Sequence, residues 1–256
     1  MDIKILGAHN SESNDTRFIS LLIDDVLAID AGGLTSGLSF DAQRKIKAIL
    51  ITHQHYDHIR DLPGLIHGFY LSGENITMYS TLPTYEVLTT HLFSGKIYPN
   101  FLERPEGNPT ARYNIINSNE EIEIEGYRIL AVPVNHSDPT VGYQVRSQDD
   151  KVLFYTGDTG PDLIGCWEKI SPQLLIIEVT APNRFEEKAA ESGHLTPAFL
   201  KRELLCFKEM KGYFPHVVAV HMAPELEEEI KAEIMTVSEE IKLPITIGFE
   251  GMQLHL

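Results

Sequence analysis

The sequence predicts a fold of mixed α and β structure, with two sheets whose outer faces are covered by helices. β-rich stretches alternate along the chain with stretches of mixed character, and they do not follow a simple β–α alternation. Several strands are apolar on both faces, such as 46–52 (IKAILIT) and 174–179 (LLIIEV), and such strands are buried between other layers. Two sheets with helices outside them satisfy both observations.

The elements follow from hydrophobic pattern and turn residues. Asp30 begins a turn, DAGG, and the region 113–154 is β-rich. Helices are expected over 62–71, 82–92 and 196–207 and in an acidic segment from Pro224, with Thr196 as N-cap and Pro197 at the first helical position. Strands are expected at 3–6, 18–23, 26–29, 46–52, 126–134, 141–145, 151–155, 174–179, 217–220, 243–249 and 252–256.

Composition narrows the class of protein. The 256 residues carry a formal net charge of −16 and show no linker or repeat, so a single domain over 1–256 is expected. An acidic surface repels phosphate backbones, which makes nucleic acid a poor candidate partner. We expect no signal peptide and no membrane partner. Cys166 and Cys206 fit neither a disulfide framework nor a thiolate zinc site, so a cytoplasmic protein is expected.

A histidine-rich segment, THQHYDH, begins at Thr52, the last residue of the strand 46–52. Alternate residues of an extended segment point the same way, so His53 and His55 can bind one metal ion. Asp57 and His58 follow a turn and can face a second ion. Imidazole and carboxylate ligands suit zinc, with manganese or iron as alternatives.

Three further candidate ligands stand at the ends of apolar strands: His136, Asp158 and His221. Taken alone, each histidine is more often structural or on the surface, and an aspartate in GDTG is more often a turn residue. Together they stand where the missing ligands of two metal ions are needed, which favours a metal site.

These pieces resemble the metallo-β-lactamase superfamily. The resemblance rests on the Asp30 turn, THQHYDH, NH at 135–136, GD at 157–158 and AVH at 219–221. It implies a four-layer αββα sandwich with a cleft for two metal ions along one edge, and a hydrolase, since redox members typically have glutamate at position 55. The implied ligands are His53, His55 and His136 for one ion, Asp57, His58 and His221 for the other, and Asp158 between them.

Two further segments are similar to class II cyclic-nucleotide phosphodiesterases. In SGHLTP, His194 would donate a proton to the leaving oxygen or stabilise transition-state charge; otherwise it is a loop histidine beside a capped helix. The segment 90–101 (THLFSGKIYPNF) would line a nucleobase pocket. Its candidate pocket residues are Phe93, Tyr98, Asn100 and Phe101, whose aromatic side chains are equally compatible with core packing.

The expected activity is metal-dependent hydrolysis of a cyclic nucleotide such as cAMP or cGMP, by a hydroxide held between two divalent ions, with zinc preferred. Asp57 would also orient the nucleophile. Two such cations, two aspartates and the hydroxide leave roughly one positive charge, which suits a small phosphodiester with a single negative charge. Members of this superfamily are often dimers, so a homodimer is an expectation by analogy alone.

Other functions stay open. A tRNA 3′-processing endonuclease of the same superfamily shares several motifs, but 137–157 is too short for the long tRNA-binding arm of such enzymes, and the net charge of −16 opposes tRNA binding. A thioester or lactone hydrolase of this fold is a further alternative. A metal-binding protein without catalytic activity is the alternative outside enzymes.

Overall fold

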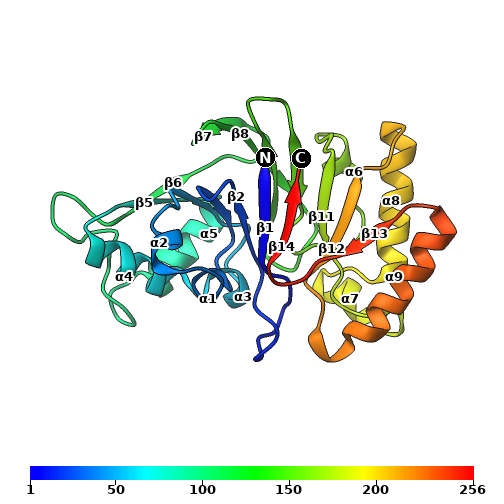
Figure 1. Ribbon diagram of the computed structural model, residues 1–256, viewed down its shortest axis with the longest axis horizontal. Helices are drawn as coiled ribbons and strands as arrows, with labels where there is room; N and C mark the ends of the chain where they lie inside the picture. Colours follow the sequence, from blue (N-terminus) through cyan, green and yellow to red (C-terminus); the bar gives the residue numbers. More distant parts are fainter.

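Two seven-stranded sheets pack face to face in the computed structural model, which describes residues 1–256, and helices cover both outer faces (Figure 1). Helices α1 to α5 lie in the left half of this view, together with β5 and β6, and α6 to α9 lie in the right half. The arrangement confirms the expected four-layer αββα sandwich.

The first sheet has the order β14-β1-β2-β3-β4-β5-β6, and the second has the order β13-β12-β11-β10-β9-β8-β7. The first contains β1 (Asp2–Gly7), β2 (Ser20–Ile23), β3 (Leu27–Ile29), β4 (Ala48–Leu50), β5 (Ile76–Ser80), β6 (Ala111–Ile115) and β14 (Met252–His255). The second contains β7 (Glu121–Ile124), β8 (Tyr127–Pro133), β9 (Val141–Arg146), β10 (Val152–Tyr155), β11 (Leu174–Glu178), β12 (His216–Val220) and β13 (Ile245–Ile247). All the expected strands are present. Most are shorter than expected, while β1, β9 and β12 are one or two residues longer. β5 lies outside the prediction, and β6 and β7 are covered only by the expectation of a β-rich region over 113–154.

The strand directions bring several strand ends to one edge. In the first sheet, β3 and β4 run parallel. In the second, β10, β11 and β12 run parallel, and β8 shares their direction because both β8 and β10 are antiparallel to β9. Loops that leave these strands at their carboxyl ends therefore start at the same edge of their sheet.

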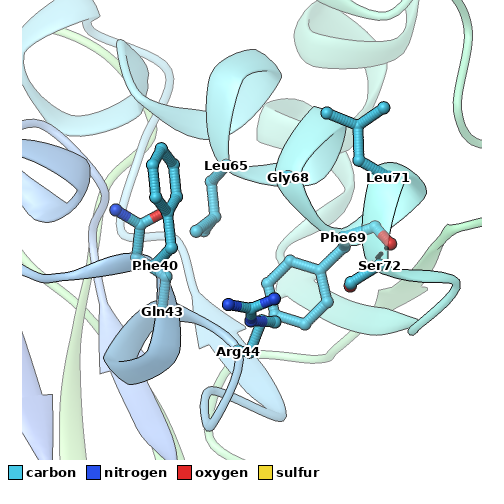
Figure 2. A pocket seen from close by; sticks show the side chains of 8 residues that line it. All are labelled: Phe40, Gln43, Arg44, Leu65, Gly68, Phe69, Leu71 and Ser72. Atoms are coloured by element: carbon cyan, nitrogen blue, oxygen red, sulfur yellow. Dashed lines mark hydrogen bonds between the residues drawn. The ribbon is translucent and has the colours of Figure 1, made fainter.

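Helices on the first sheet are short except for α4. They are α1 (Leu34–Gly37), α2 (Phe40–Gln43), α3 (Tyr56–Ile59), α4 (Leu62–Ser72) and α5 (Leu82–Val87), which continues as a π-helical turn, Leu88–Leu92. α4 and α5 with its extension confirm the predicted helices 62–71 and 82–92. A shallow groove between α2 and α4 has the exposed ring of Phe40 on one side and Leu71 on the other (Figure 2).

Helices on the second sheet include two long ones. They are α6 (Ile164–Trp167), α7 (Glu186–Ser192), α8 (Pro197–Lys211) and α9 (Glu227–Ile241), with single 3-10 turns at Asn183–Phe185 and Pro224–Leu226. Thr196 Oγ1 accepts a hydrogen bond from the amide of Phe199 at 3.4 Å, and Pro197 is the first helical residue, so the predicted N-terminus of α8 is confirmed. No helix combines the length and the apolar character that crossing a membrane requires.

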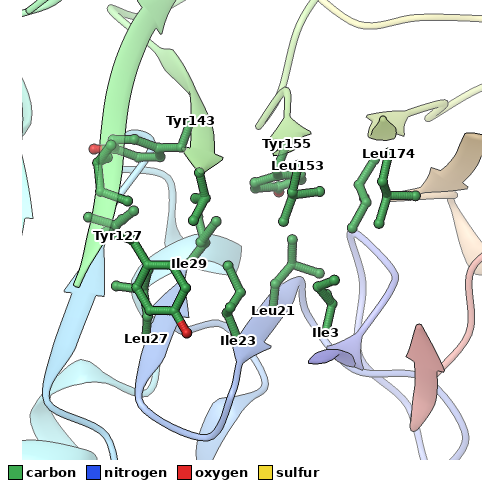
Figure 3. Packing of buried hydrophobic residues seen from close by; sticks show 14 of the residues in the cluster. Ile3, Leu21, Ile23, Leu27, Ile29, Tyr127, Tyr143, Leu153, Tyr155 and Leu174 are labelled. Atoms are coloured by element: carbon green, nitrogen blue, oxygen red, sulfur yellow. The ribbon is translucent and has the colours of Figure 1, made fainter. Parts of the chain in front are cut away.

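The main hydrophobic core lies between the two sheets. Ile3 and Leu21 of the first sheet face Tyr155 and Leu174 of the second (Figure 3). Burying each such aliphatic side chain contributes about 1.5–3 kcal/mol. Tyr143 adds a polar tie, because its hydroxyl donates to the carbonyl of residue 51 at 2.9 Å. This hydrogen bond is made to the residue directly before the histidine-rich segment, so the core also fixes where that segment begins.

Candidate metal centre

The histidine-rich segment leaves β4 and enters α3, and it meets three loops from the second sheet. His136 follows β8, Asp158 follows β10, and His221 directly follows β12. The four loops start at the edge described above. All seven predicted ligands lie in two groups that share one residue.

The first group contains His53, His55, His136 and Asp158, whose potential ligand atoms lie within 4.8 Å of one another. His136 Nε2 is 3.2 Å from His55 Nδ1, and His53 Nε2 is 3.7 Å from Asp158 Oδ2. Three imidazoles and a carboxylate oxygen therefore surround a single point, as in a tetrahedral zinc site.

The second group contains Asp57, His58, Asp158 and His221, again within 4.8 Å. His221 Nε2 lies 3.1 Å from Asp57 Oδ2 and 3.2 Å from Asp158 Oδ1. Asp158 presents Oδ2 to the first group and Oδ1 to the second. This geometry suits a carboxylate that bridges two ions.

Unpartnered polar atoms test whether these residues fit a metal. His53 Nε2, His58 Nε2 and Asp158 Oδ1 are buried and make no hydrogen bond. The last two lie 3.1 Å apart without the alignment of a hydrogen bond. Buried polar atoms without a partner are costly, and nitrogen and oxygen lone pairs that converge are what a divalent cation requires. The residues therefore fit the metal ions that the motif predicts.

The protonation states of the buried groups also suit metal ligands. Burial holds the pKa of His53 well below its usual range, so this imidazole is neutral. Burial alone would raise the pKa of Asp158, but the neighbouring His221 and His58 hold it well below its usual range. Burial would lower the pKa of His58, yet Asp158 and Asp30 raise it well above its usual range. Metal binding at His58 must therefore displace a proton.

Supporting residues that the sequence did not assign hold two of the histidines. Asp30 is fully buried, and its Oδ2 accepts from His58 Nδ1 at 2.7 Å, which leaves His58 Nε2 for the cluster. Asp30 also accepts from the amide and hydroxyl of Thr52. Asp138 Oδ2 lies 2.8 Å from His55 Nε2, which leaves His55 Nδ1 for the cluster. Such carboxylate–histidine pairs orient ligands. The sequence signals for them were the positions of Asp30, directly after β3, and of Asp138, two residues after His136.

His194 lies beside the cluster. Its ring is stacked against that of His221, with centroids 5.7 Å apart and planes at 17°. Its Nδ1 is 2.7 Å from Oε1 of the buried Glu178, the last residue of β11. Burial would lower the pKa of His194, but Glu178 raises it to about 9. Glu178 is a further residue that sequence reasoning missed, because it reads as part of an apolar strand.

The loop that carries His194 is seated directly on His136. His136 Nδ1 donates to the carbonyl of Gly193 at 2.8 Å. Gly193 has φ +73°, and a Cβ there would come within 2.7 Å of His136 Cα, so only glycine permits this approach. The same contact leaves His136 Nε2 free for the cluster.

The predicted nucleobase segment does not reach this cleft. Phe93 and Phe101 are buried in the core between the first sheet and its helices, where Phe101 packs against Tyr70 of α4. Tyr98 and Asn100 line a separate groove. The chain after the π-helical turn folds back onto α4, which carries these side chains away from the metal ligands. The cleft itself is lined by Asn10, Ser11, Glu12, Phe18, His55, Tyr56, Asp57, Asp158, His194 and His221.

Comparisons with known proteins agree with this fold. A family model described as the beta-lactamase superfamily domain matches residues 22–222. A probable 3',5'-cyclic-nucleotide phosphodiesterase of Yersinia pestis is 27% identical over 188 residues, which are 66% of this chain and 53% of that protein. A ribonuclease Z of Prochlorococcus marinus is 30% identical over 169 residues, 60% of this chain and 52% of that protein. The chain thus spans about half the length of the curated relatives it matches.

Among solved structures, unliganded yeast PDE1 matches with a TM-score of 0.83 and 19% identity, over 100% of this chain and 99% of that one. At this level of identity the match concerns the fold. It shows the same arrangement of two sheets and flanking helices over the whole chain.

Proposed function

This chain belongs to the β-lactamase superfamily, and on that basis we propose that it is a metal-dependent hydrolase that cleaves the phosphodiester bond of a cyclic nucleotide. The observation that carries the proposal is the position of His194. This imidazole is held by Glu178 and faces a cluster that can hold two cations. The similarity to a protein named as a cyclic-nucleotide phosphodiesterase supports the choice of substrate.

The charge of the cleft supports an anionic substrate only when cations are bound. The residues that line it include Glu12, Asp57 and Asp158 but neither lysine nor arginine. These three carboxylates outnumber the one protonated histidine of the lining, His194, so the metal-free cleft is unfavourable for a phosphate group. His53, His55 and His136 would hold one ion, Asp57, His58 and His221 the other, and Asp158 both. Two bound divalent ions would supply the attraction for the phosphate and lower the pKa of a water molecule toward about 7.

The choice of metal follows from the donor set. Imidazole and carboxylate donors without thiolate suit zinc, and manganese or iron are the alternatives. The two cysteines are free, Cys166 buried and Cys206 half-buried. Free thiols support a reducing compartment, so we place the protein in the cytoplasm.

The residues of the chain then have separate tasks in the reaction. The attacking water loses one proton to bulk solvent. Asp57, which would also be a ligand of one ion, accepts a hydrogen bond from the resulting hydroxide and orients it toward phosphorus. The new P–O bond forms as the bond from phosphorus to one ester oxygen breaks. His194, protonated at neutral pH, donates its proton to that departing oxygen. Glu178 stabilises the imidazolium before transfer and fixes its orientation.

A substrate screen tests the proposal. The zinc- and manganese-loaded protein is assayed with cyclic nucleotides, an activated phosphodiester, a thioester and a precursor tRNA. We expect turnover of cyclic nucleotides and of the activated phosphodiester, with Asp158→Ala as the inactive control. Turnover of the thioester alone would show that the phosphodiesterase assignment is wrong, and turnover of none would favour a binding protein.

A second candidate, tRNA 3′-end processing, is favoured by the similarity to a ribonuclease Z. The loop between His136 and Asp158 argues against it. This stretch contains only β9, β10 and short connections, with no inserted arm. The formal net charge of −16 and the lack of basic residues in the cleft also oppose tRNA binding. The precursor tRNA in the screen separates the two candidates.

A further inference from the structure

Two aromatic side chains, Phe18 and Tyr56, form a wall of the cleft beside the proposed metal ligands. We infer that this wall is the subsite for the planar base of the substrate, which stacks on the aromatic rings while its phosphate lies at the metal ligands. The inference rests on the proposed function, since it assigns the nucleoside part of the same substrate. It assigns base binding to Phe18 and Tyr56 in place of the segment 90–101, which the sequence predicted for this role.

Tyr56 has the position and exposure of a ligand-binding residue. It stands between His55 and Asp57 in the chain and begins α3, yet its side chain remains 65% exposed. Its ring and that of Phe18 have centroids 6.2 Å apart and lie at 83° to each other. One ring edge is therefore directed at the other ring's face. A large exposed aromatic side chain in an otherwise polar cleft is typical of a binding surface.

Phe18 is held rigidly by its surroundings. The guanidinium carbon of Arg60 lies 5.1 Å from the centroid of its ring. Arg60 is fixed in turn by Asp61, at 2.9 Å, and by Glu12. With two carboxylate partners, Arg60 is not available to bind a phosphate. It acts instead as a cationic support for the aromatic wall.

Gly32 sets the distance between this wall and the metal ligands. A Cβ at position 32 would come within 1.8 Å of the carbonyl oxygen of Asp57 and 2.6 Å of Phe18 Cβ. The backbone of Asp57 and the side chain of Phe18 therefore approach each other across a position without a side chain. The aromatic wall and a proposed metal ligand are thereby joined as one preformed unit.

The chemistry of the wall selects a planar group. Apart from the two aromatic residues, the cleft is lined by polar and acidic side chains and histidines. A phosphate has no free cation on this wall, since Arg60 is paired with Asp61 and Glu12, and an aliphatic group would find little apolar surface beyond the rings. A nucleobase has a π face that stacks on aromatic rings, an interaction that strengthens binding roughly 5- to 160-fold per base.

The test compares two ligands that differ only in the base. Dissociation constants of AMP and ribose 5-phosphate are measured by calorimetry on the zinc-loaded protein. In the wild type, AMP should bind more tightly. Tyr56→Leu and Phe18→Leu should each weaken AMP binding about tenfold and leave ribose 5-phosphate unchanged. Tyr56→Phe, which keeps the ring, should retain most of the AMP affinity.

Phe40→Leu is the matched control. Phe40 is 74% exposed and lies in the groove between α2 and α4, outside the cleft (Figure 2). It should change neither dissociation constant. Zinc content is measured for every variant, so that a loss of metal is distinguished from a loss of stacking.

The results separate the two proposals. Equal weakening of both ligands, unchanged AMP binding in Tyr56→Leu and Phe18→Leu, or a wild type without preference for AMP would each overturn the base subsite. If the base preference is present and depends on the two rings but no cyclic nucleotide is cleaved, the subsite stands and the proposed reaction fails. If cyclic nucleotides are cleaved but the ring substitutions do not change AMP binding, the proposed reaction stands and the base subsite fails.

Discussion

Glu178 Oε1 lies 2.7 Å from Nδ1 of His194, and Glu178 is completely buried. The carboxylate also accepts hydrogen bonds from the amide of Thr159 at 3.0 Å, the hydroxyl of Thr180 at 2.8 Å and the amide of Leu195 at 3.2 Å. These donors fix the carboxylate, and the carboxylate fixes the ring. In the proposed reaction Glu178 therefore serves as a positioning residue, and His194 is the residue that would contact the substrate.

Glu178→Gln should lower kcat about 10- to 100-fold, because His194 loses the partner that keeps it protonated. Activity that requires protonated His194 is present below its pKa and is lost as the pH rises through it. In the wild type this loss should occur at or below about pH 9, since bound cations oppose protonation. In the variant it should move to lower pH. The measurement is kcat against pH.

Glu203→Gln is the control for this change. Glu203 is also a buried carboxylate, and it accepts from the amides of Asp162 and Leu163 and from Trp167 Nε1 at 3.0 Å. The substitution should reduce stability without moving the pH profile. An unchanged profile in Glu178→Gln would remove Glu178 from the mechanism.

His194→Ala should retain both metal ions but reduce turnover about 10²- to 10⁴-fold, the usual contribution of a general acid. The effect should be smaller for a substrate whose leaving group needs no proton, such as a nitrophenyl phosphodiester. Metal content and kcat for both substrate types are the measurements. Equal losses for the two substrates would argue against proton donation.

Asp158→Ala should abolish loading of two ions, because both proposed ions lose the ligand they share. Asp138→Asn is a milder comparison, since Asp138 only orients His55, and such partners typically contribute 10- to 100-fold in metal affinity. Metal content per chain and a competition titration with a chelator measure both effects. Two ions retained in Asp158→Ala would disprove the bridging role.

His9 and Glu250 should make stability depend on pH. Their Nδ1 and Oε1 atoms lie 2.6 Å apart. Burial would lower the pKa of His9, but Glu250 and Glu227 raise it above its ordinary 6.5. Burial would raise the pKa of Glu250, but His9 and the amide of Arg17 lower it below its ordinary 4.5. The ion pair is therefore fully present in the folded protein between about pH 4.5 and 6.5.

His9→Gln should cost about 1–3 kcal/mol of unfolding free energy within that window. The cost should shrink as the pH rises through the raised pKa of His9, and also as it falls through the lowered pKa of Glu250. Urea unfolding at pH 5.5 and 8.5 measures the difference. His255→Gln, which removes a solvent-exposed pairing with Asp2, should have little effect at either pH. A cost that does not vary with pH would mean that His9 acts by packing alone.

The ligand set could be predicted because each candidate stands just beyond an apolar strand. His136, Asp158 and His221 carry a local signal, a polar residue where a buried strand ends, and the parallel strand directions bring those ends together. That inference needs only the strand pattern. Whether these residues bind metal stays a prediction.

The supporting residues could not be predicted in the same way. The pairing of Glu178 with His194 depends on a loop and a helix that return the chain to β11, which no local pattern encodes. Aromatic residues such as Phe93 and Phe101 occur both in ligand pockets and in hydrophobic cores, so the sequence leaves both roles open. In the structure they pack with residues of α4 in the core. Conversely, Phe18 and Tyr56 are far apart in the sequence and meet only because Gly32 permits the approach.

The proposed ligands come from both sheets. Four belong to the segment that runs from β4 into α3, and the remaining three belong to loops of the second sheet. Neither half of the sandwich holds a complete coordination sphere. Binding of both ions therefore requires that the two sheets are packed together. Ions that bind only this packed form stabilise it by mass action. Depletion of metal would therefore lower the stability of the packing between the two sheets as well as the proposed hydrolytic activity.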